Sequence, residues 1–405
     1  MRPAVIFIMI TVMIDAMGIG LMIPVMPDLI REVNGGDLSQ AAVWGGILAT
    51  TFAAMQFLFG PIIGGLSDRY GRRKILLISL VVMAADYVVM ALAGSIWLLL
   101  AGRVVGGITA ATQATASAYM ADISTAEQRT KSFGLIGAAF GMGFVLGPLI
   151  GGVLAEYGTR APFWAAAFLA TSNVIFGWFV LKETLAPEKA RAFNWRRANP
   201  FGAVKQLGKL PGVHQLLMVY FLYNVAFAVY PSVWAYFGQE RFDWAPTTIG
   251  LSLGLFGITM AFVQGYFIRV ALRVFGERRT VVVGLLFALG TYTAIGSITA
   301  GWLILLLTPI AALGGITPIA LQGIMSQRVA DNAQGELQGA LTSAVSLAMI
   351  VTPLVMTATF SYFTQAGTPF YMPGAPFLLS AMLILLGLLI FALRRRAGSE
   401  ASVNG

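Results

Sequence analysis

Three charged residues interrupt the long apolar stretches of this sequence: Asp15, Asp86 and Arg103. Each stretch is long enough to cross a membrane, where an uncompensated charge costs about 3 kcal/mol or more. The two acids are therefore the candidate counter-charges for the arginine. A carboxyl group in such surroundings can take up or release a proton when its pairing with an arginine changes. We expect these residues to couple proton movement to transport, the alternative being a static ion pair that holds helices together.

A second group of charges lies in the segment GGLSDRYGRR at residues 64–73. Its acid and arginines directly follow an apolar stretch, so the segment forms a loop at a membrane surface. A carboxylate there can meet the N-terminus of a helix, an attraction worth about 0.3 to 2 kcal/mol. Such charges can also serve only to set the membrane topology of the chain.

Membrane-spanning helices must position these residues. Of the 405 residues, 58% are hydrophobic and 11% are charged, whereas soluble domains carry roughly 25% charged residues. Apolar runs of about 20 residues, enough to cross the hydrocarbon core as a helix, recur along the chain. They are too long and too uniformly apolar for the strands of a membrane barrel. The sequence predicts an all-α integral membrane protein with twelve transmembrane helices at residues 4–26, 42–66, 74–94, 97–120, 132–156, 161–181, 213–237, 246–270, 280–299, 302–326, 336–363 and 374–394.

The basic residues are distributed unevenly over the predicted loops, although the net charge is +9. One set of alternate loops, together with both termini, carries 22 of the 26 lysines and arginines, and the other set carries three. Positive charge accumulates on the cytoplasmic side of membrane proteins. We therefore expect a multi-pass protein of a bacterial inner membrane, surrounded by lipids, with both termini in the cytoplasm. The basic excess is then a topology signal, and no nucleic-acid partner is expected.

The chain divides into two similar halves. Its longest polar stretch, residues 182–212, separates six predicted helices from six, either lying on the membrane surface or solvated. Parallel repeats of this kind build two bundles around a central site that is reached alternately from either side. We expect a six-helix bundle at 1–181, a cytoplasmic linker at 182–212, a second six-helix bundle at 213–394 and a cytoplasmic tail at 395–405. Matching residues recur at an offset of 205: Gly71 and Gly276, Trp97 and Trp302, Met120 and Met325, Gly134 and Gly339, and Pro148 and Pro353.

Few residues could serve enzymatic or metal chemistry. The chain has no cysteine, and its one histidine, His214, lies at the start of a predicted helix. No pairing of a nucleophile with a base and no metal-binding cluster is visible, so we expect neither an enzyme nor a bound cofactor. The first apolar stretch is over-long for a secretory signal and holds Asp15 at its centre, so we expect it to be retained.

The segment at residues 64–73 resembles the cytoplasmic gate loop of the major facilitator superfamily. The resemblance implies the two-bundle fold of that superfamily. It also implies that Asp68 caps the N-terminus of the eleventh helix and that Arg69 and Arg72 pair with an acid that ends the fourth helix, here Asp122. The expected gate residues are Gly64, Asp68, Arg69, Gly71, Arg72, Arg73, Asp122 and Arg129.

The fifth predicted helix carries the sequence GMGFVLGPLIGG at residues 141–152. Small residues along one face let helices approach closely, and generic packing would explain the glycines alone. The full spacing resembles the motif of drug/proton antiporters in the same superfamily. The residues of that motif are Gly143, Gly147, Pro148, Gly151 and Gly152.

Several longer segments, including residues 15–32, 68–80 and 121–134, resemble tetracycline/proton antiporters. Within this resemblance, Asp15 and Asp86 match acids important for transport. The family carries a further aspartate in helix 9, and that position is Ala288 here. Tetracycline leaves as a cationic metal chelate, so losing a carboxylate weakens its attraction and puts tetracycline as the substrate in question. A divalent cation is expected only as part of such a chelate.

The resemblance implies a proton-driven exporter of an amphipathic drug-like compound, working as a monomer by alternating access, with tetracycline as the first substrate to test. Export of another compound, such as a macrolide, phenicol or siderophore, is one alternative. A membrane receptor or assembly partner without transport activity is another, since a fold does not fix function. Substrate pockets combine apolar walls with a few polar groups. The candidate pocket residues are Gln56, Gln113, Asn224, Gln264, Ala288 and Gln322.

Overall fold

The computed structural model of the chain describes residues 3–110, 112–125, 128–185, 188, 193, 199–200, 212–330 and 333–401. Side chains are described for these residues except 112, 113, 129–131 and 394–401. Throughout the described part, regular structure is helical and no strand is present. A membrane interior offers no water to the backbone, so spanning segments must satisfy their own N–H and C=O groups, as helices do.

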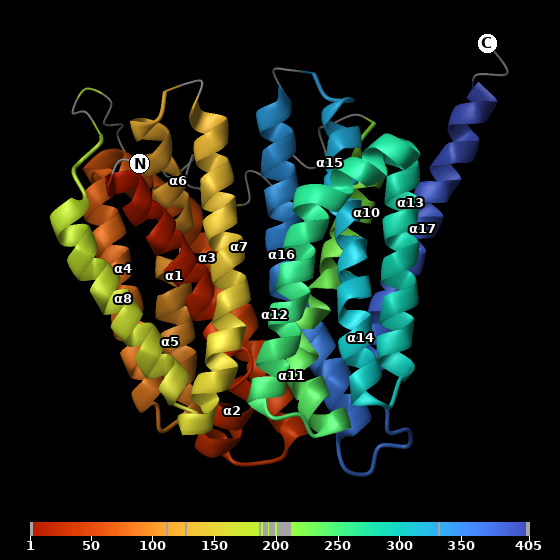
Figure 1. The fold of residues 1–405 in the computed structure, drawn as a ribbon, viewed down its shortest axis with the longest axis horizontal. Helices are drawn as coiled ribbons and strands as arrows, with labels where there is room; N and C mark the ends of the chain where they lie inside the picture. The colour runs from red at the N-terminus through yellow and green to blue at the C-terminus, as the bar shows by residue number, and fades with distance from the viewer. Residues whose placement is uncertain are drawn as a thin grey trace. The chain divides into compact units, whose positions relative to one another are not determined.

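The chain forms two compact units, Met1–Pro200 with Trp244–Gly254, and Phe201–Asp243 with Leu255–Gly405. Within each unit the helices run side by side as a bundle, coloured red to yellow in the first and green to blue in the second (Figure 1). The helices are α1 Pro3–Met22, α2 Met26–Asn34, α3 Leu38–Tyr70, α4 Arg72–Leu92, α5 Ile96–Thr109, α6 Thr112–Ile123, α7 Arg129–Leu154, α8 Ala161–Val180, α10 His214–Phe227, α11 Val229–Phe242, α12 Pro246–Phe262, α13 Ile268–Ser297, α14 Gly301–Ala312, α15 Ile316–Ser326, α16 Gln334–Thr364 and α17 Ala375–Ala401. Short irregular turns are the 3-10 segments η2 Ala155–Tyr157 and η5 Leu313–Gly315 and the π-helical segment η4 Val263–Phe267.

Eleven helical stretches among the described residues are long and apolar enough to cross a membrane. One of them, Pro246–Ser297, is 52 residues long. A continuous helix of that length would extend about 78 Å, more than twice the hydrocarbon thickness. Gly276 interrupts it with a non-helical conformation, φ 70° and ψ 168°. Divided there, the stretches number twelve, as the sequence predicts.

Three helices predicted as continuous are interrupted, which corrects the prediction in detail. The span at 213–237 breaks between α10 and α11, and the span at 302–326 breaks at η5. A proline ring crowds the carbonyl four residues earlier, which kinks or breaks some helices, although Pro61, Pro148, Pro309 and Pro353 stand inside helices of this chain. Pro231 stands four residues after Phe227, where α10 ends, and Pro318 stands four after Gly314 in η5. The span at 97–120 divides into α5 and α6, and α17 continues beyond its predicted end at 394.

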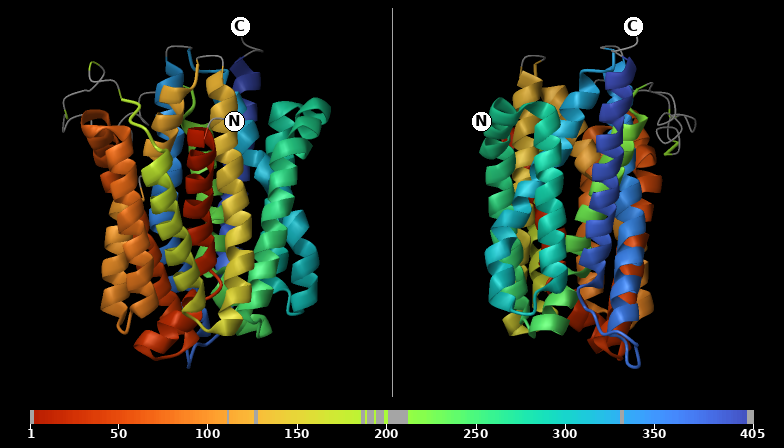
Figure 2. Two further views of the ribbon diagram at one scale, coloured as in Figure 1. Left: turned by 60° about the vertical axis from the view of Figure 1, so that its left-hand side comes forward. Right: turned by 90° about the vertical axis from the view of Figure 1, so that its right-hand side faces the viewer.

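The drug/proton antiporter motif lies where α7 packs along α1, a contact visible in the left view of Figure 2. Its glycines at 143, 147 and 151 occupy one face of α7, four residues apart, and each lies against a backbone carbonyl of α1. A Cβ at Gly147 would lie 2.6 Å from the carbonyl oxygen of Met17. The motif therefore brings two main chains together, which any side chain on this face would prevent. The facing carbonyls are those of Met13, Met17 and Leu21.

Gly152 and the carbonyl group of Pro148 face a different helix, while the ring of Pro148 lies against Gly20 of α1. A Cβ at Gly152 would lie 2.6 Å from the carbonyl oxygen of Pro246, in the part of α12 that belongs to the first unit. The carbonyl of Pro148 in turn lies against Gly250. The hydroxyl of Thr247 donates to the carbonyl of Gly152 at 3.2 Å and to the Glu156 carboxylate at 2.9 Å. The motif thus packs α7 against both α1 and the start of α12.

We predict that Gly147→Val destabilises the protein by about 1 to 3 kcal/mol, because overpacking forces helices apart. Gly141→Val is the matched control, since Gly141 lies on the same helix with no atom near the position of a Cβ. The measurement is the Tm of each purified variant in detergent. Equal Tm values for the two variants would contradict the α1–α7 packing.

Candidate functional site

A buried ion pair joins two of the three charges that the sequence places inside the membrane. The Arg103 guanidinium in α5 donates from Nη2 to Oδ2 of Asp86 in α4 at 3.0 Å. The two side chains retain only 7% and 4% of their accessible surface. The same Nη2 contacts the sulfur of Met90, and the Phe52 ring lies 5.2 Å from the guanidinium carbon. Arginine is thus neutralised by one acid and surrounded by polarisable groups.

Two glycines of α5 make room for the acid. A Cβ at Gly102 would lie 2.7 Å from Oδ1 of Asp86, and a Cβ at Gly106 would lie 2.7 Å from Oδ2. These glycines are four residues apart, so they occupy one face of the helix. Oδ1 of Asp86 and Nε of Arg103 have no hydrogen-bond partner. The pair therefore has unused hydrogen-bonding capacity inside the bundle.

Tyr87 follows Asp86 in α4 and packs against α1, the helix that carries the third charge. It is 4% exposed, and its hydroxyl fills the space left by the missing side chain of Gly18 in α1. It lies within electrostatic range of Asp15, Asp86 and Arg103. Asp15 precedes Gly18 by three residues, so it lies about one helical turn from the Tyr87 contact along α1. Asp15 is partly buried and makes no hydrogen bond or ion pair with another described residue.

The gate loop is organised by Arg72, the first residue of α4. Its Nη1 pairs with Oδ1 of Asp68 at 2.5 Å, and its Nε pairs with Oδ2 of Asp122 at 3.3 Å. Nη1 also donates to the hydroxyl of Ser67 at 2.7 Å. One guanidinium therefore links the end of α3 to the end of α6. Of the expected gate residues, Asp68, Arg72 and Asp122 are in direct contact.

Other expected gate residues lie elsewhere. The guanidinium of Arg69 lies 5.0 Å from the Tyr70 ring, whereas Asp122 pairs with Arg72, so the pairing of Arg69 with Asp122 stays a prediction. Arg73 donates to the carbonyl of Trp178 at 2.9 Å. Gly64 has open space around it. The side chain of Arg129 lies outside the described residues. Capping of the eleventh helix, α16, by Asp68 would join the two units and stays a prediction.

The opposite end of the first unit holds another ion pair. Arg160 donates from Nε to Glu32 at 3.0 Å and from Nη1 to the carbonyl of Ala91 at 2.8 Å. The hydroxyl of Thr159 also donates to Glu32. The hydrogen bond from Thr159, aided by Arg160, holds the pKa of Glu32 below its usual value. These contacts tie α2 to the ends of α4 and α8.

The candidate pocket residues are distributed over both units. Gln56 donates to the carbonyl of Ala110 at 3.4 Å, which joins α3 to the end of α5. Asn224 bonds to the carbonyl of Tyr220 in its own helix at 2.8 Å. Gln322 donates to Gln338 at 3.3 Å, and Gln264 is exposed in the π-helical segment η4. The side chain of Gln113 is outside the described part of the chain. Three of these amides thus have partners within the protein.

Ala288 is buried, with 3% of its surface exposed. It faces Gly314 in η5, where a Cβ on the glycine would lie 3.2 Å from that of the alanine. The neighbouring Gly315 lies against the side chain of Met260, which stands in the last turn of α12. Irregular helical segments often mark functional sites. The position that carries an acid in the resembled family therefore lies beside the break in the tenth span.

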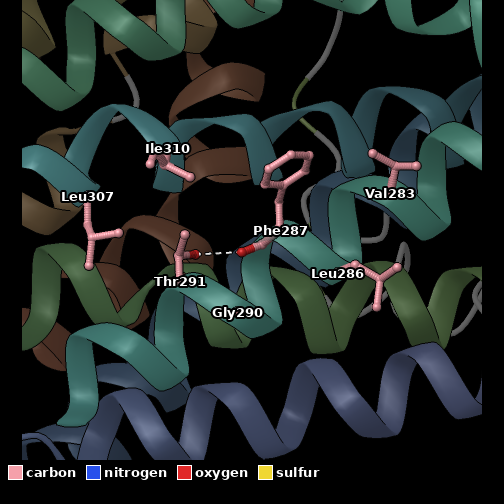
Figure 3. Close-up of a pocket in the computed structure, with 7 residues that line it drawn as sticks. All are labelled: Val283, Leu286, Phe287, Gly290, Thr291, Leu307 and Ile310. Carbon is pink, nitrogen blue, oxygen red and sulfur yellow. Dashed lines mark hydrogen bonds between the residues drawn. The ribbon is translucent and has the colours of Figure 1, made fainter. Parts of the chain in front are cut away.

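A cavity of about 400 Å³ lies between α13 and α14 (Figure 3), and Ala288 is not among its lining residues. Its one hydroxyl, on Thr291, donates to the carbonyl of Phe287 at 2.8 Å. The cavity therefore presents an apolar surface and no free polar group, unlike a site for a polar ligand. None of the candidate pocket residues lines it. Its lining residues are Val283, Leu286, Phe287, Gly290, Thr291, Leu307 and Ile310.

Sequence reasoning missed several residues of the site. Tyr87 adjoins Asp86 in the sequence but carries no charge, so nothing marked it as the link to α1. Gly102 and Gly106 stand four residues apart, on either side of Arg103 in the sequence. This spacing could have indicated that a neighbouring helix approaches α5 closely at Arg103. Asn173, buried in α8, donates to the hydroxyl of Thr11 at 3.0 Å. In the sequence, only its polar side chain within an apolar run indicated such a contact. Glu183 also lies at the gate, where it accepts hydrogen bonds from α4.

The arrangement suits movement of protons and helices better than bond-making chemistry. Asp15 is unpaired and Asp86 has one free oxygen, so either can hold a proton. Among the residues that the structure describes, no group of three or more His, Asp or Glu is placed to hold a metal ion. Buried charges on adjoining helices inside a bundle are typical of transport pathways and proton relays.

The fold and these charges define a multi-pass membrane transporter, and sequence comparison identifies its superfamily. The profile of the Major Facilitator Superfamily matches residues 8–242 and 215–404. A bacterial homolog of the human lysosomal transporter Spinster, solved in an inward-facing and occupied conformation, has a TM-score of 0.78 and 16% identity, over 97% of this chain and 96% of that chain. At that identity the likeness concerns the fold alone.

Closer relatives narrow the family. Tetracycline resistance protein, class C, of Escherichia coli is 40% identical over 399 residues, 98% of each chain. Tetracycline resistance protein, class G, of Vibrio anguillarum is 38% identical over 89% of this chain and 91% of the relative. The chain belongs to the Major Facilitator Superfamily and, within it, to the family of the tetracycline resistance proteins. It is a transporter and not an enzyme, and the predicted family is confirmed.

We predict that Asp86→Asn lowers stability by about 3 to 5 kcal/mol, because it leaves the buried Arg103 without a counter-charge. Adding Arg103→Gln should restore most of this loss. The exposed pair of Arg31 and Asp28 is the control, since Asp28→Asn should change stability by about 1 kcal/mol or less. Thermal unfolding of the purified variants measures these effects. A double variant no more stable than Asp86→Asn alone would contradict the pairing.

Proposed function

We propose that this protein is a proton-coupled exporter of an amphipathic, tetracycline-type compound that works by alternating access. The names of its relatives support this class of substrate. The observation that carries proton coupling is the ion pair of Asp86 and Arg103, next to which Tyr87 packs against α1, the helix that carries the unpaired Asp15. Protonation of Asp86 would release Arg103, and a released arginine must find another acid or water. Coupling follows if that exchange accompanies the movement of α1, α4 and α5.

The proposal includes a location and a state of assembly. The distribution of basic residues supports a bacterial inner membrane with both termini in the cytoplasm. The loop of Asp68 and Arg72 then lies on the cytoplasmic side, where its ion pairs serve as the gate. We propose a functional monomer with protons and the exported compound as its partners. A divalent cation would enter only as part of a chelated substrate.

Ala288 favours a second candidate, an exporter of a different drug or metabolite. A carboxylate about 4 Å from a cationic substrate contributes roughly 4 kcal/mol at an effective dielectric constant of 20. This chain lacks that carboxylate at position 288, and the neighbouring Thr291 is neutral. A less cationic compound, such as a phenicol or a macrolide, would lose less by its absence. Drug-susceptibility profiles of cells that express the protein distinguish the two candidates.

Asp15→Asn is predicted to abolish export driven by a pH gradient, because an amide cannot carry a titrating proton. Transport of tetracycline into inverted membrane vesicles measures this. Substrate exchange without a gradient should persist, which separates lost coupling from lost binding. Asp15→Glu is the conservative control and should retain part of the coupled rate. Gradient-driven export at the wild-type rate in Asp15→Asn would contradict the assignment.

Ala288→Asp is predicted to raise tetracycline export, and the wild type is predicted to export tetracycline weakly. Ala288→Asn is the matched control, since it has the same shape without the charge and should give no gain. Efflux is measured for tetracycline and for an uncharged drug, the second of which should not benefit from the new carboxylate. Strong export by the wild type, with no gain in a well-expressed Ala288→Asp, would contradict the role of the missing acid.

A further inference from the structure

The side chain of Glu183, just after the last helix of the first bundle, collects hydrogen bonds from two separate parts of the chain. Its Oε1 accepts from the backbone N–H of Arg72 at 2.9 Å, and its Oε2 accepts from that of Arg73 at 3.2 Å. Oε1 also accepts from the N–H groups of Thr184 and Leu185, at 3.0 and 3.1 Å. Four backbone donors therefore converge on one carboxylate, although Glu183 is an exposed residue.

Two of these donors belong to the first turn of α4, which has no cap of its own. The first N–H groups of a helix lack partners within the helix, and a side chain usually supplies them. The N-cap of α4 is Gly71, which has no side chain. A carboxylate is the favoured group at this position, because the helix dipole adds to its hydrogen bonds. Glu183 therefore supplies, from 111 residues along the chain, the cap that Gly71 cannot.

Gly71 also creates the space that the cap occupies. Its φ of 106° is a conformation that side chains with a Cβ rarely adopt. A Cβ at this position would overlap the carboxylate of Glu183. The glycine of the GGLSDRYGRR segment thus serves both the turn and the approach of the distant acid.

The residues around Glu183 are attached to the same loop. The hydroxyl of Tyr119 in α6 donates to the carbonyl of Lys182 at 2.9 Å. Thr184 donates to Oδ2 of Asp122 at 3.3 Å, the oxygen that also accepts from Arg72. The segment Leu181–Leu185 therefore holds both partners of the gate ion pair, Arg72 through its backbone and Asp122 through its carboxylate.

We propose that Glu183 is a positioning residue of the cytoplasmic gate. By capping α4 it fixes the backbone of Arg72, whose side chain then reaches Asp68 and Asp122. The inference rests on the proposed gate role of Arg72. It makes the start of the segment between the two bundles a part of the gate, so that a displacement of Leu181–Leu185 removes the cap and disturbs the ion pair together.

The cap itself is tested by hydrogen exchange of the amides in the first turn of α4. Glu183→Gln keeps one acceptor oxygen but turns an NH₂ group toward the other N–H, and Gly71→Ala displaces the carboxylate without removing it. Each should speed exchange at residues 72–75 by about fivefold, the effect of a lost N-cap. Glu188→Gln, which removes an exposed acid five residues further along, is the control and should leave exchange unchanged. Wild-type exchange in both Glu183→Gln and Gly71→Ala would overturn the cap.

The positioning role is tested by turnover in proteoliposomes. Glu183→Gln should lower kcat roughly fivefold with little change in KM, as expected when the gate and not the substrate site is disturbed. Because Glu183 acts through Arg72, the same change added to Arg72→Ala should cause little further loss. Full additivity of the two effects, or normal turnover in Glu183→Gln despite faster exchange, would overturn the inference.

One further variant separates this inference from the function on which it rests. Wild-type turnover in Arg72→Ala would overturn the gate role of Arg72, and with it the positioning role of Glu183, while the exchange measurement would still report the cap. Impaired turnover in Arg72→Ala with normal turnover in Glu183→Gln would leave the gate in place and overturn the positioning role alone.

Discussion

An arginine inside a membrane must have a counter-charge, and in the first bundle this requirement organises three helices. Arg103 reaches Asp86, and the two carboxylate oxygens occupy the spaces that Gly102 and Gly106 leave on α5. Tyr87 follows Asp86 and inserts its hydroxyl at Gly18 of α1. One electrostatic constraint therefore determines where small residues must stand on two neighbouring helices. In the proposed coupling, the same pair is the group whose protonation changes the balance of charge in the bundle.

Small residues serve a second purpose along α7, where backbone approaches backbone. In the α1 contact the neighbours of Gly143, Gly147 and Gly151 are backbone carbonyl oxygens, which do not yield as a flexible side chain would. Close packing at this face depends on shape and dispersion, because lipid leaves little hydrophobic driving force between helices. Tyr87 and the glycine face of α7 thus both pack against α1.

The sequence contained most of the fold and part of the site. Twelve spans follow from apolar runs. The breaks at Phe227 and η5 adjoin Pro231 and Pro318, but Pro61, Pro148 and Pro353 stand inside helices, so the prolines alone could not locate the breaks. Arg103 was restricted to two possible acids, but periodicity cannot say which faces it, because that depends on how α4 and α5 are rotated. Glu183 was unpredictable for a different reason. Its partners are backbone N–H groups, which every residue has, so no residue type marks the contact.

The cap on α4 also has a consequence for how the protein is made. A ribosome completes α4 when it has translated Leu92, yet the carboxylate that closes the first turn of this helix is encoded 91 codons later, at Glu183. The loop before α4 therefore reaches its final form only after the sixth span has entered the membrane. A chain stopped before that point would leave the first turn of α4 without its cap.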